Sequence, residues 1–305
     1  MANDYSYENC IETSERVAWT IEEVLGGTGF DFEKNFLPES LARVQHIVCL
    51  SDKEKLRLNQ IRGLTYAHLF GFVEEFIVRK IVDLAASYPS SKSVERRALL
   101  RFAEEETKHQ LLFERTKAAL LSGLGDCGLV PGAGDVAGFV LSKSELSVLL
   151  LISMLEWTTQ HHYVDIFSSG FEREALDPTF MQIFKSHWVE EAQHAKLDHL
   201  EIERVAKGVD PTARETAVDE LLEIGGAFDG LLKAQAELDI ESLQRLTGRK
   251  LSDKEKEEVL SKQHQAYRWT FLGSALKHPK FNAQVAALTK NGPAKIEQAA
   301  AVMSA

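Results

Sequence analysis

Two segments of the sequence pair a glutamate with a histidine three residues later, Glu106 with His109 and Glu191 with His194. In the second segment His187 precedes Glu191 by four residues. At about 100° per residue these three side chains fall within an arc of roughly 60° on one helix face. Stacked imidazole and carboxylate groups facing a protein interior need a partner, because each unsatisfied buried polar group costs about 1–3 kcal/mol. Metal ligation is therefore the leading interpretation, and a buried salt-bridge network is the alternative.

The first motif is weak evidence when it is taken alone. Glu106 ends a run of three glutamates, and such a run is usually a solvated helix face. Glu106 and His109 nevertheless lie in helical register with the apolar residues Leu99 and Phe102, which predicts that both polar side chains point inward. The second motif, with its additional His187, makes metal binding the better interpretation of both.

A third predicted helix carries one isolated carboxylate. Glu156 is the only acidic residue within residues 146–164, and Leu149 and Ile152 share its helix face. A carboxylate among apolar neighbours requires a cation, since burial of an unpaired charge is very costly. Glu156 is therefore a candidate metal ligand.

The first long predicted helix contains two adjacent glutamates, of which one is expected to face inward. Glu74 lies on the apolar stripe that includes Phe70 and Ile77, whereas Glu75 shares its side of the helix with Arg79. We choose Glu74 as the ligand on this periodicity, and Glu75 remains the alternative.

The complete predicted ligand set holds four carboxylates and three imidazoles from four helices: Glu74, Glu106, His109, Glu156, His187, Glu191 and His194. Four glutamates balance the charge of two divalent ions. Mixed carboxylate and imidazole ligation suits iron, with manganese possible at one or both positions. Zinc prefers closed four-coordinate sites and calcium prefers oxygen ligands alone. The set predicts a dinuclear centre inside a helical bundle.

The elements that must position these residues are all predicted to be helices. Capping boxes at residues 51–54 and 252–255 mark helix starts. Long helices are expected over about 51–87, 94–121, 145–168 and 178–206, with further helices over about 212–246 and 252–276. The segment 123–138, with six glycines, is expected to be a loop, and the tail after residue 291 is expected to fray.

This order of helices predicts an all-α fold, a ferritin-like four-helix bundle with additional C-terminal helices packed on it. We expect a single domain over residues 1–305, with the core bundle at about 52–206 and the additional helices at about 212–290.

Composition excludes several other classes of protein. The net charge of −11 argues against a nucleic-acid partner, because phosphate binding requires an excess of basic residues. Three widely spaced cysteines suggest neither a disulfide framework nor a zinc ribbon, and indicate a reducing compartment. No apolar run approaches the roughly 18 residues of a membrane span, and the N-terminus does not resemble a signal peptide. We expect a cytoplasmic protein without a membrane partner, and a homodimer.

On these residues the sequence resembles the para-aminobenzoate N-oxygenase family of non-haem di-iron enzymes. The most specific feature is the H-x-x-x-E-x-x-H motif of His187, Glu191 and His194, and the likeness extends over about residues 56–199. The resemblance implies a monooxygenase, an oxidoreductase that activates O2 at two iron ions and transfers oxygen to a small organic substrate, in that family often an arylamine nitrogen. It also implies catalytic roles for Glu106, Glu191 and His187, the last by saturating one iron.

The sequence offers candidates for a substrate pocket and leaves two other functions open. Five residues share helix faces with the ligands, although such a set more often belongs to a plain core: Phe70, Phe113, Thr159, Gln160 and Tyr163. Electrons must come from an external donor, because the chain has no flavin or iron–sulfur motif. The alternatives to an oxygenase are an iron-oxidising or peroxide-reducing protein without an organic substrate, and a non-enzymatic interaction protein with a polar core.

Overall fold

The computed structural model describes residues 5–27, 29–167 and 175–304. Over these residues the regular structure is helical, and the only β pairing is an isolated bridge between Asn35 and Leu176. The predicted all-α fold class is therefore confirmed. None of the helices in these three ranges combines the length and the apolar composition needed to cross a membrane.

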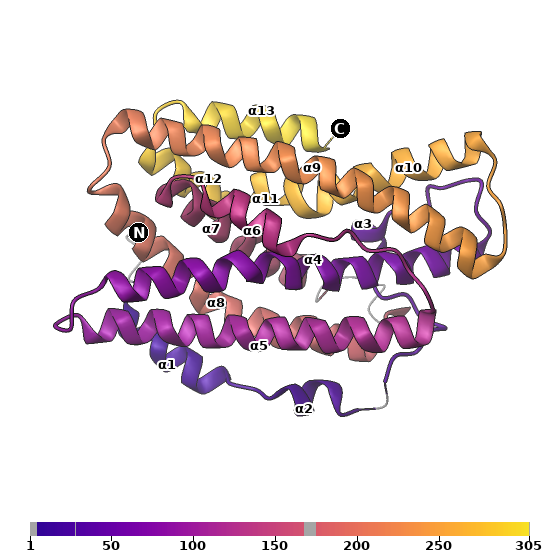
Figure 1. Ribbon diagram of the computed structural model, residues 1–305, viewed down its shortest axis with the longest axis horizontal. Coiled ribbons are helices and arrows are strands. Elements are labelled where there is room, and N and C mark those ends of the chain that lie inside the picture. Colours follow the sequence, from indigo (N-terminus) through magenta and orange to yellow (C-terminus); the bar gives the residue numbers. More distant parts are fainter. Residues whose placement is uncertain (1–4, 28, 168–174, 305) are drawn as a thin grey trace.

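Four long helices form the central bundle (Figure 1): α4 (Asp52–Ser87), α5 (Ser93–Leu124), α7 (Glu145–His161) and α8 (Pro178–Ala206). Helices α4 and α5 lie side by side and antiparallel, joined by a short turn, and α7 packs mainly against α8. Their inward faces carry the buried apolar residues expected from the helical periodicity, such as Ile81, Leu99 and Ile152. The arrangement is the predicted four-helix bundle.

Local sequence signals explain where these helices begin. The backbone N–H of Ser51 donates to the Glu54 carboxylate at 2.8 Å, which completes the capping box at the start of α4. Helix α8 begins with Pro178, and the Asp177 side chain accepts a hydrogen bond from the N–H of Phe180 at 2.6 Å. These caps fix the positions of α4 and α8 along the chain, and therefore the heights of the residues they carry.

Outer helices cover two opposite faces of the bundle (Figure 1). On one face α1 (Tyr7–Val17) and α2 (Ile21–Leu25) contact α5 and α8. On the other, α6 (Ala133–Leu141) and α9 (Pro211–Thr247) contact α4 and α7. The remaining helical segments extend the second layer or border it: α3 (Glu39–Ala42), α10 (Asp253–Arg268), the π-helix η3 (Trp269–Gly273), α11 (Ser274–Leu276), α12 (Pro279–Leu288) and α13 (Gly292–Ser304).

Three sequence expectations need correction. The glycine-rich segment contains helix α6, whose Ala137 and Val140 are buried against the bundle, so small residues here allow close packing rather than a loop. The C-terminal tail forms α13, which is held by the buried Ile296 and Ala300. Helix α7 passes into a second π-helix, η1 (His162–Phe167), and the predicted end at residue 168 lies outside the described residues.

Candidate metal centre

The structure brings all seven predicted ligand residues into the middle of the bundle. Helix α4 carries Glu74, α5 carries Glu106 and His109, and α7 carries Glu156. Helix α8 carries His187, Glu191 and His194. Each has at most 3% of its surface exposed, so the cluster is shielded from solvent on every side. Seven ionisable side chains therefore share one interior site.

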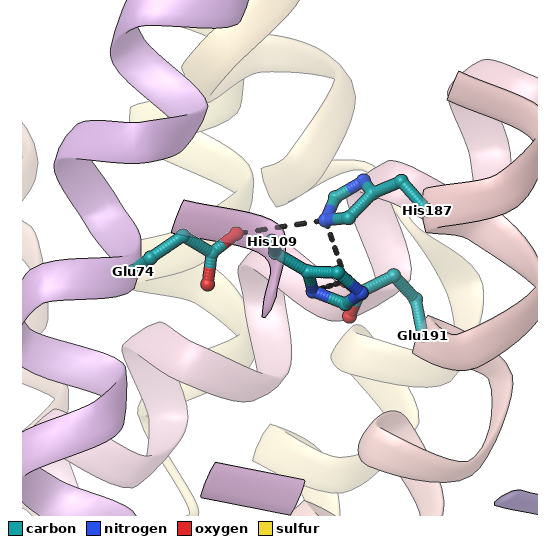
Figure 2. A group of neighbouring side chains, drawn as sticks. All are labelled: Glu74, His109, His187 and Glu191. Atoms are coloured by element: carbon teal, nitrogen blue, oxygen red, sulfur yellow. Dashed lines mark ion pairs between the residues drawn. The ribbon is translucent and has the colours of Figure 1, made fainter. Parts of the chain in front are cut away.

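The ligand atoms form two groups, within each of which they lie within 4.8 Å of one another. The first group, drawn in Figure 2, contains Glu74, His109, His187 and Glu191. The second contains Glu106, Glu156, Glu191 and His194. Glu191 belongs to both groups, and its carboxylate is therefore placed to bridge two ions.

Lone pairs in the cluster meet one another without hydrogen bonds. His187 Nε2 lies 2.6 Å from Glu191 Oε1 and 3.5 Å from Glu74 Oε1, and neither contact has hydrogen-bond geometry. Both carboxylate oxygens of Glu106 are also buried without a hydrogen-bond donor, although one lies 2.7 Å from His194 Nδ1. Buried acceptors that face one another are costly unless a cation lies between them. The residues present therefore fit two metal ions.

The outward nitrogens of two histidines are held by carboxylates from the facing helix. His109 Nε2 lies 2.9 Å from Glu190 Oε2, and His194 Nε2 lies 2.7 Å from Glu105 Oε2. A carboxylate accepts only, so each Nε2 must carry a proton, which leaves each Nδ1 as the nitrogen that would bind a metal ion. This is the usual support for a histidine that binds a metal ion.

The two supporting carboxylates have partners of their own. Lys108 Nζ lies 2.5 Å from Glu190 and 4.1 Å from the centre of the Trp19 ring. The Trp19 ring in turn lies nearly parallel to the His109 ring, 5.9 Å away. The face of the bundle that α1 and α2 cover is therefore linked to the candidate centre through Trp19, Lys108 and Glu190.

At the other histidine, Ser14 on α1 donates a hydrogen bond to Glu105, and Arg101 donates to Ser14 at 2.7 Å. Gln193 also donates to Glu105, at 3.3 Å. Each supporting carboxylate thus has a hydrogen-bonded or charged partner outside the cluster, which holds it in place as an acceptor for its histidine.

Burial and mutual repulsion divide the carboxylates into two kinds. Burial, and then the charges of Glu106 and Glu191, raise the pKa of Glu74 well above its ordinary value. Burial and the charge of Glu191 likewise raise the pKa of Glu156 well above its ordinary value. Burial and the charge of Glu191 also oppose ionisation of Glu106, but the adjoining Glu74 carboxyl group and the charges of His194 and His109 outweigh them and lower its pKa to about 2. Without metal, neighbouring carboxyl groups therefore share protons.

Burial and the same carboxylate charges also shift the pKa values of the three histidines. Burial acts to lower the pKa of His109 and His194, but the surrounding carboxylates outweigh it and raise both well above the ordinary value. For His187 burial dominates and lowers the pKa. Positive charge is therefore drawn to the place where metal cations would lie, while His187 keeps a neutral ring with a free lone pair.

The two glutamates of α4 lie in different surroundings, and only Glu74 is placed as a candidate ligand. Glu74 lies in the cluster, whereas the Glu75 side chain is 33% exposed and pairs with Arg79 on the outside of the helix. The sequence reasoning missed Glu105 and Glu190. A signal was present, because both motifs read Glu-Glu-x-x-His, but the run of glutamates suggested a solvated face.

The five residues predicted to line a substrate pocket fall into separate places. The rings of Phe70 and Phe113 lie 5.3 and 5.0 Å from the His187 ring, against the candidate centre. The Tyr163 ring stacks on Trp188 at 4.5 Å, and Gln160 donates to the backbone carbonyl of Trp188. The Thr159 hydroxyl donates to the carbonyl of Leu155 within its own helix. Their role in substrate binding stays a prediction.

Comparison with known proteins identifies similar solved structures at low sequence identity. No protein-family model and no curated protein matches this chain. Among solved structures, an R2-like ligand-binding oxidase with an aerobically reconstituted Mn/Fe cofactor is 16% identical, covering 87% of this chain and 92% of its own, with a TM-score of 0.48. A variant of an R2-like ligand-binding oxidase with an Fe/Fe cofactor is also 16% identical, covering 87% and 93%, at the same TM-score.

A further variant with a non-activated Mn/Mn cofactor is 15% identical, covering 88% of this chain and 94% of its own, with a TM-score of 0.46. The residues of this chain themselves define its class: a four-helix bundle with a candidate carboxylate–histidine centre for two metal ions.

Proposed function

We propose that this protein is a non-haem di-iron oxygenase that uses O2 to oxygenate a small organic substrate, with N-oxygenation of an amine as the specific reaction. The observation that carries the proposal is the convergence of seven buried ligand-type side chains, in which several nitrogen and oxygen atoms have no hydrogen-bond partner. Structural salt bridges would satisfy these atoms, so a purely structural role does not explain them.

The donor set favours iron, with manganese as the other candidate. Four carboxylates and three imidazoles are harder ligands than a thiolate site provides, and they are too rich in nitrogen for calcium. The two groups differ in composition. The first group of Figure 2 has two imidazoles and two carboxylates, whereas the second has one imidazole and three carboxylates. Two positions with different ligands would give the two ions different roles in O2 reduction.

Each residue then has a defined task. Glu191 spans both positions, Glu74 and Glu156 each complete one of them, and His187 adds the imidazole that makes the first position distinct. When bound in the reduced state, the two ions supply the electrons for O2 activation. Phe70 and Phe113 pack against His187 and keep water from that side of the cluster.

His187 is also the reason to prefer an oxygenase to a protein that only oxidises iron or reduces peroxide. His187 would give one ion a ligand more than a pair of Glu-x-x-His motifs supplies, and this would tune the reactivity of that ion. The chain contains no flavin or iron–sulfur motif. An external electron donor is therefore part of the proposal for repeated turnover.

The test is a single-turnover reaction. Protein loaded anaerobically with ferrous iron is mixed with ¹⁸O2 in the presence and absence of an arylamine. We expect about two iron ions per chain by metal analysis and an amine product that carries ¹⁸O, detected by mass spectrometry. Two ferrous ions supply the two electrons that one oxygenation requires. A ferric mineral with no labelled product would instead support the iron-handling alternative.

Two histidine variants make the test specific to the centre. His187→Ala is expected to lower the product yield by about tenfold or more, since even residues that support ligands change affinity or activity by about 10–100-fold. His199→Ala is the matched control, because His199 lies on the same helix with its side chain 24% exposed and outside both groups. Equal yields from the two variants would contradict the assigned role of His187.

A further inference from the structure

An apolar cavity of about 280 Å³ lies between the bundle helices α4 and α7 and the outer layer of α6, α9 and η3. Val73, Phe76 and Met154 form part of the bundle side, and Ile224 and Phe271 part of the outer side. Among the described residues that line the cavity, Asp135 alone has a polar side chain, and it lies exposed on α6. None of the seven candidate metal ligands lines this cavity.

A glycine in the middle of α9 helps to keep the cavity open. A Cβ atom on Gly225 would have Leu272 as its nearest neighbour, at 3.9 Å, so no close backbone approach requires glycine there. Glycine inside a helix is less stable than alanine by about 0.5–1 kcal/mol. Gly225 lines the cavity directly, and we therefore attribute the glycine at this position to the space that it leaves open.

The neighbouring Gly226 provides a useful contrast. A Cβ atom on Gly226 would meet nothing within 4 Å, and this residue is exposed and does not line the cavity. The opposite wall is formed by η3, whose π-helical turn carries Phe271 and Leu272 to the cavity surface. Irregular helical turns of this kind are frequent at functional sites.

The lining determines the chemistry of an occupant. It offers no cation for an acid, and the exposed Asp135 would repel an anion at the rim. An apolar cavity also holds water poorly, and one of about 150 Å³ is known to bind benzene. We propose that this cavity binds an uncharged apolar molecule of about ten to twelve carbon atoms, a size scaled from the benzene cavity.

Two aromatic rings separate this site from the candidate metal centre. The Phe271 ring lies 6.3 Å from the Phe70 ring, and the Phe70 ring lies 5.3 Å from the His187 ring. The proposed ligand site is therefore distinct from the cluster, and binding to it can be measured without added metal. Binding alone, without turnover, is the relevant measurement.

The probe is decan-1-ol, with decanoate as its anionic counterpart, titrated by calorimetry into the full chain without added metal. Gly225→Leu places a side chain in the cavity and is expected to weaken decan-1-ol binding by about tenfold or more, because it removes the buried apolar contact area. Gly226→Leu carries the same side chain outside and is expected to bind like the original protein. Decanoate is expected to bind more weakly than decan-1-ol.

Val136→Trp fills the same cavity from α6 and replaces Gly225→Leu if that variant does not fold. Absence of decan-1-ol binding to the unmodified chain would overturn the proposal. So would equal binding by the two leucine variants, or equal affinity for decan-1-ol and decanoate. Circular dichroism and thermal unfolding of each variant establish that the helices are intact.

Discussion

His109 on α5 is held by Glu190 on α8, with 2.9 Å between Nε2 and the carboxylate oxygen. The reciprocal contact joins His194 on α8 to Glu105 on α5 at 2.7 Å. Each Glu-Glu-x-x-His segment therefore contributes its second glutamate to the candidate centre and uses its first to support the histidine of the other helix. A one-residue slip between α5 and α8 would break both contacts, so this exchange fixes the register of the two helices.

Removal of a supporting carboxylate should weaken metal binding without removing a ligand. We expect Glu190→Ala to lower metal affinity by about 10–100-fold, because His109 loses the acceptor that fixes its ring. Competition for Co²⁺ against a coloured chelator measures the change. Glu104→Ala is the control, since Glu104 is an exposed glutamate of α5 next to the other supporting residue, Glu105. If Glu190→Ala binds Co²⁺ as tightly as the control, the support is not functional.

The adjacent glutamates of α4 allow a matched comparison. Glu74→Ala is expected to lose at least one metal equivalent per chain, because it removes a carboxylate from one group and Glu191 couples that group to the other. Glu75→Ala is expected to keep the full metal content, since its side chain pairs with Arg79 at the surface. Metal analysis after anaerobic loading distinguishes them. Metal loss in the second variant but not the first would reverse the assignment.

Metal binding should release protons and strengthen as pH rises. The raised pKa values of His109 and His194 and of Glu74 and Glu156 mean that the metal-free protein holds protons on these residues near neutral pH. A cation must displace those protons, so a lower pH opposes binding. Calorimetry in buffers of different ionisation enthalpy counts the protons released. An affinity for Co²⁺ that is the same at pH 6 and pH 8 would contradict this expectation.

Glu156 is expected to destabilise the metal-free fold. One of its oxygens is buried without a hydrogen-bond partner, and burial together with Glu191 raises its pKa. Glu156→Leu should therefore raise the free energy of unfolding of the metal-free protein by about 1–3 kcal/mol, the cost of an unsatisfied buried group. Urea denaturation measures the change.

The same variant should lose most of the stabilisation that metal gives, because a ligand that binds only the folded state stabilises it in proportion to occupancy. Urea denaturation with and without metal therefore gives opposite signs for Glu156→Leu. A variant that is less stable than the original protein in both conditions would show that Glu156 has a structural role.

Much of this arrangement follows from local sequence. Capping residues such as Asp177 fix helix starts, and a period of 3.6 residues identifies the inward faces that bring Glu74 and Glu156 toward the Glu-x-x-His pairs. The roles of Glu105 and Glu190 could not be read in the same way, because each depends on which residue of the facing helix lies opposite. The cavity beside Gly225 depends on the packing of the outer layer and on a π-helical turn, for which the sequence gives no periodic signal.

Glu191 contributes a ligand atom to both groups, and this couples the two metal-binding steps. An ion held by Glu74, His109, His187 and Glu191 would orient the shared Glu191 carboxylate and displace protons from its neighbours, which would prepare the second position. By thermodynamic linkage, each ion changes the affinity for the other by the same factor, whichever binds first. The centre should therefore fill cooperatively, with few molecules holding a single ion at intermediate metal concentrations.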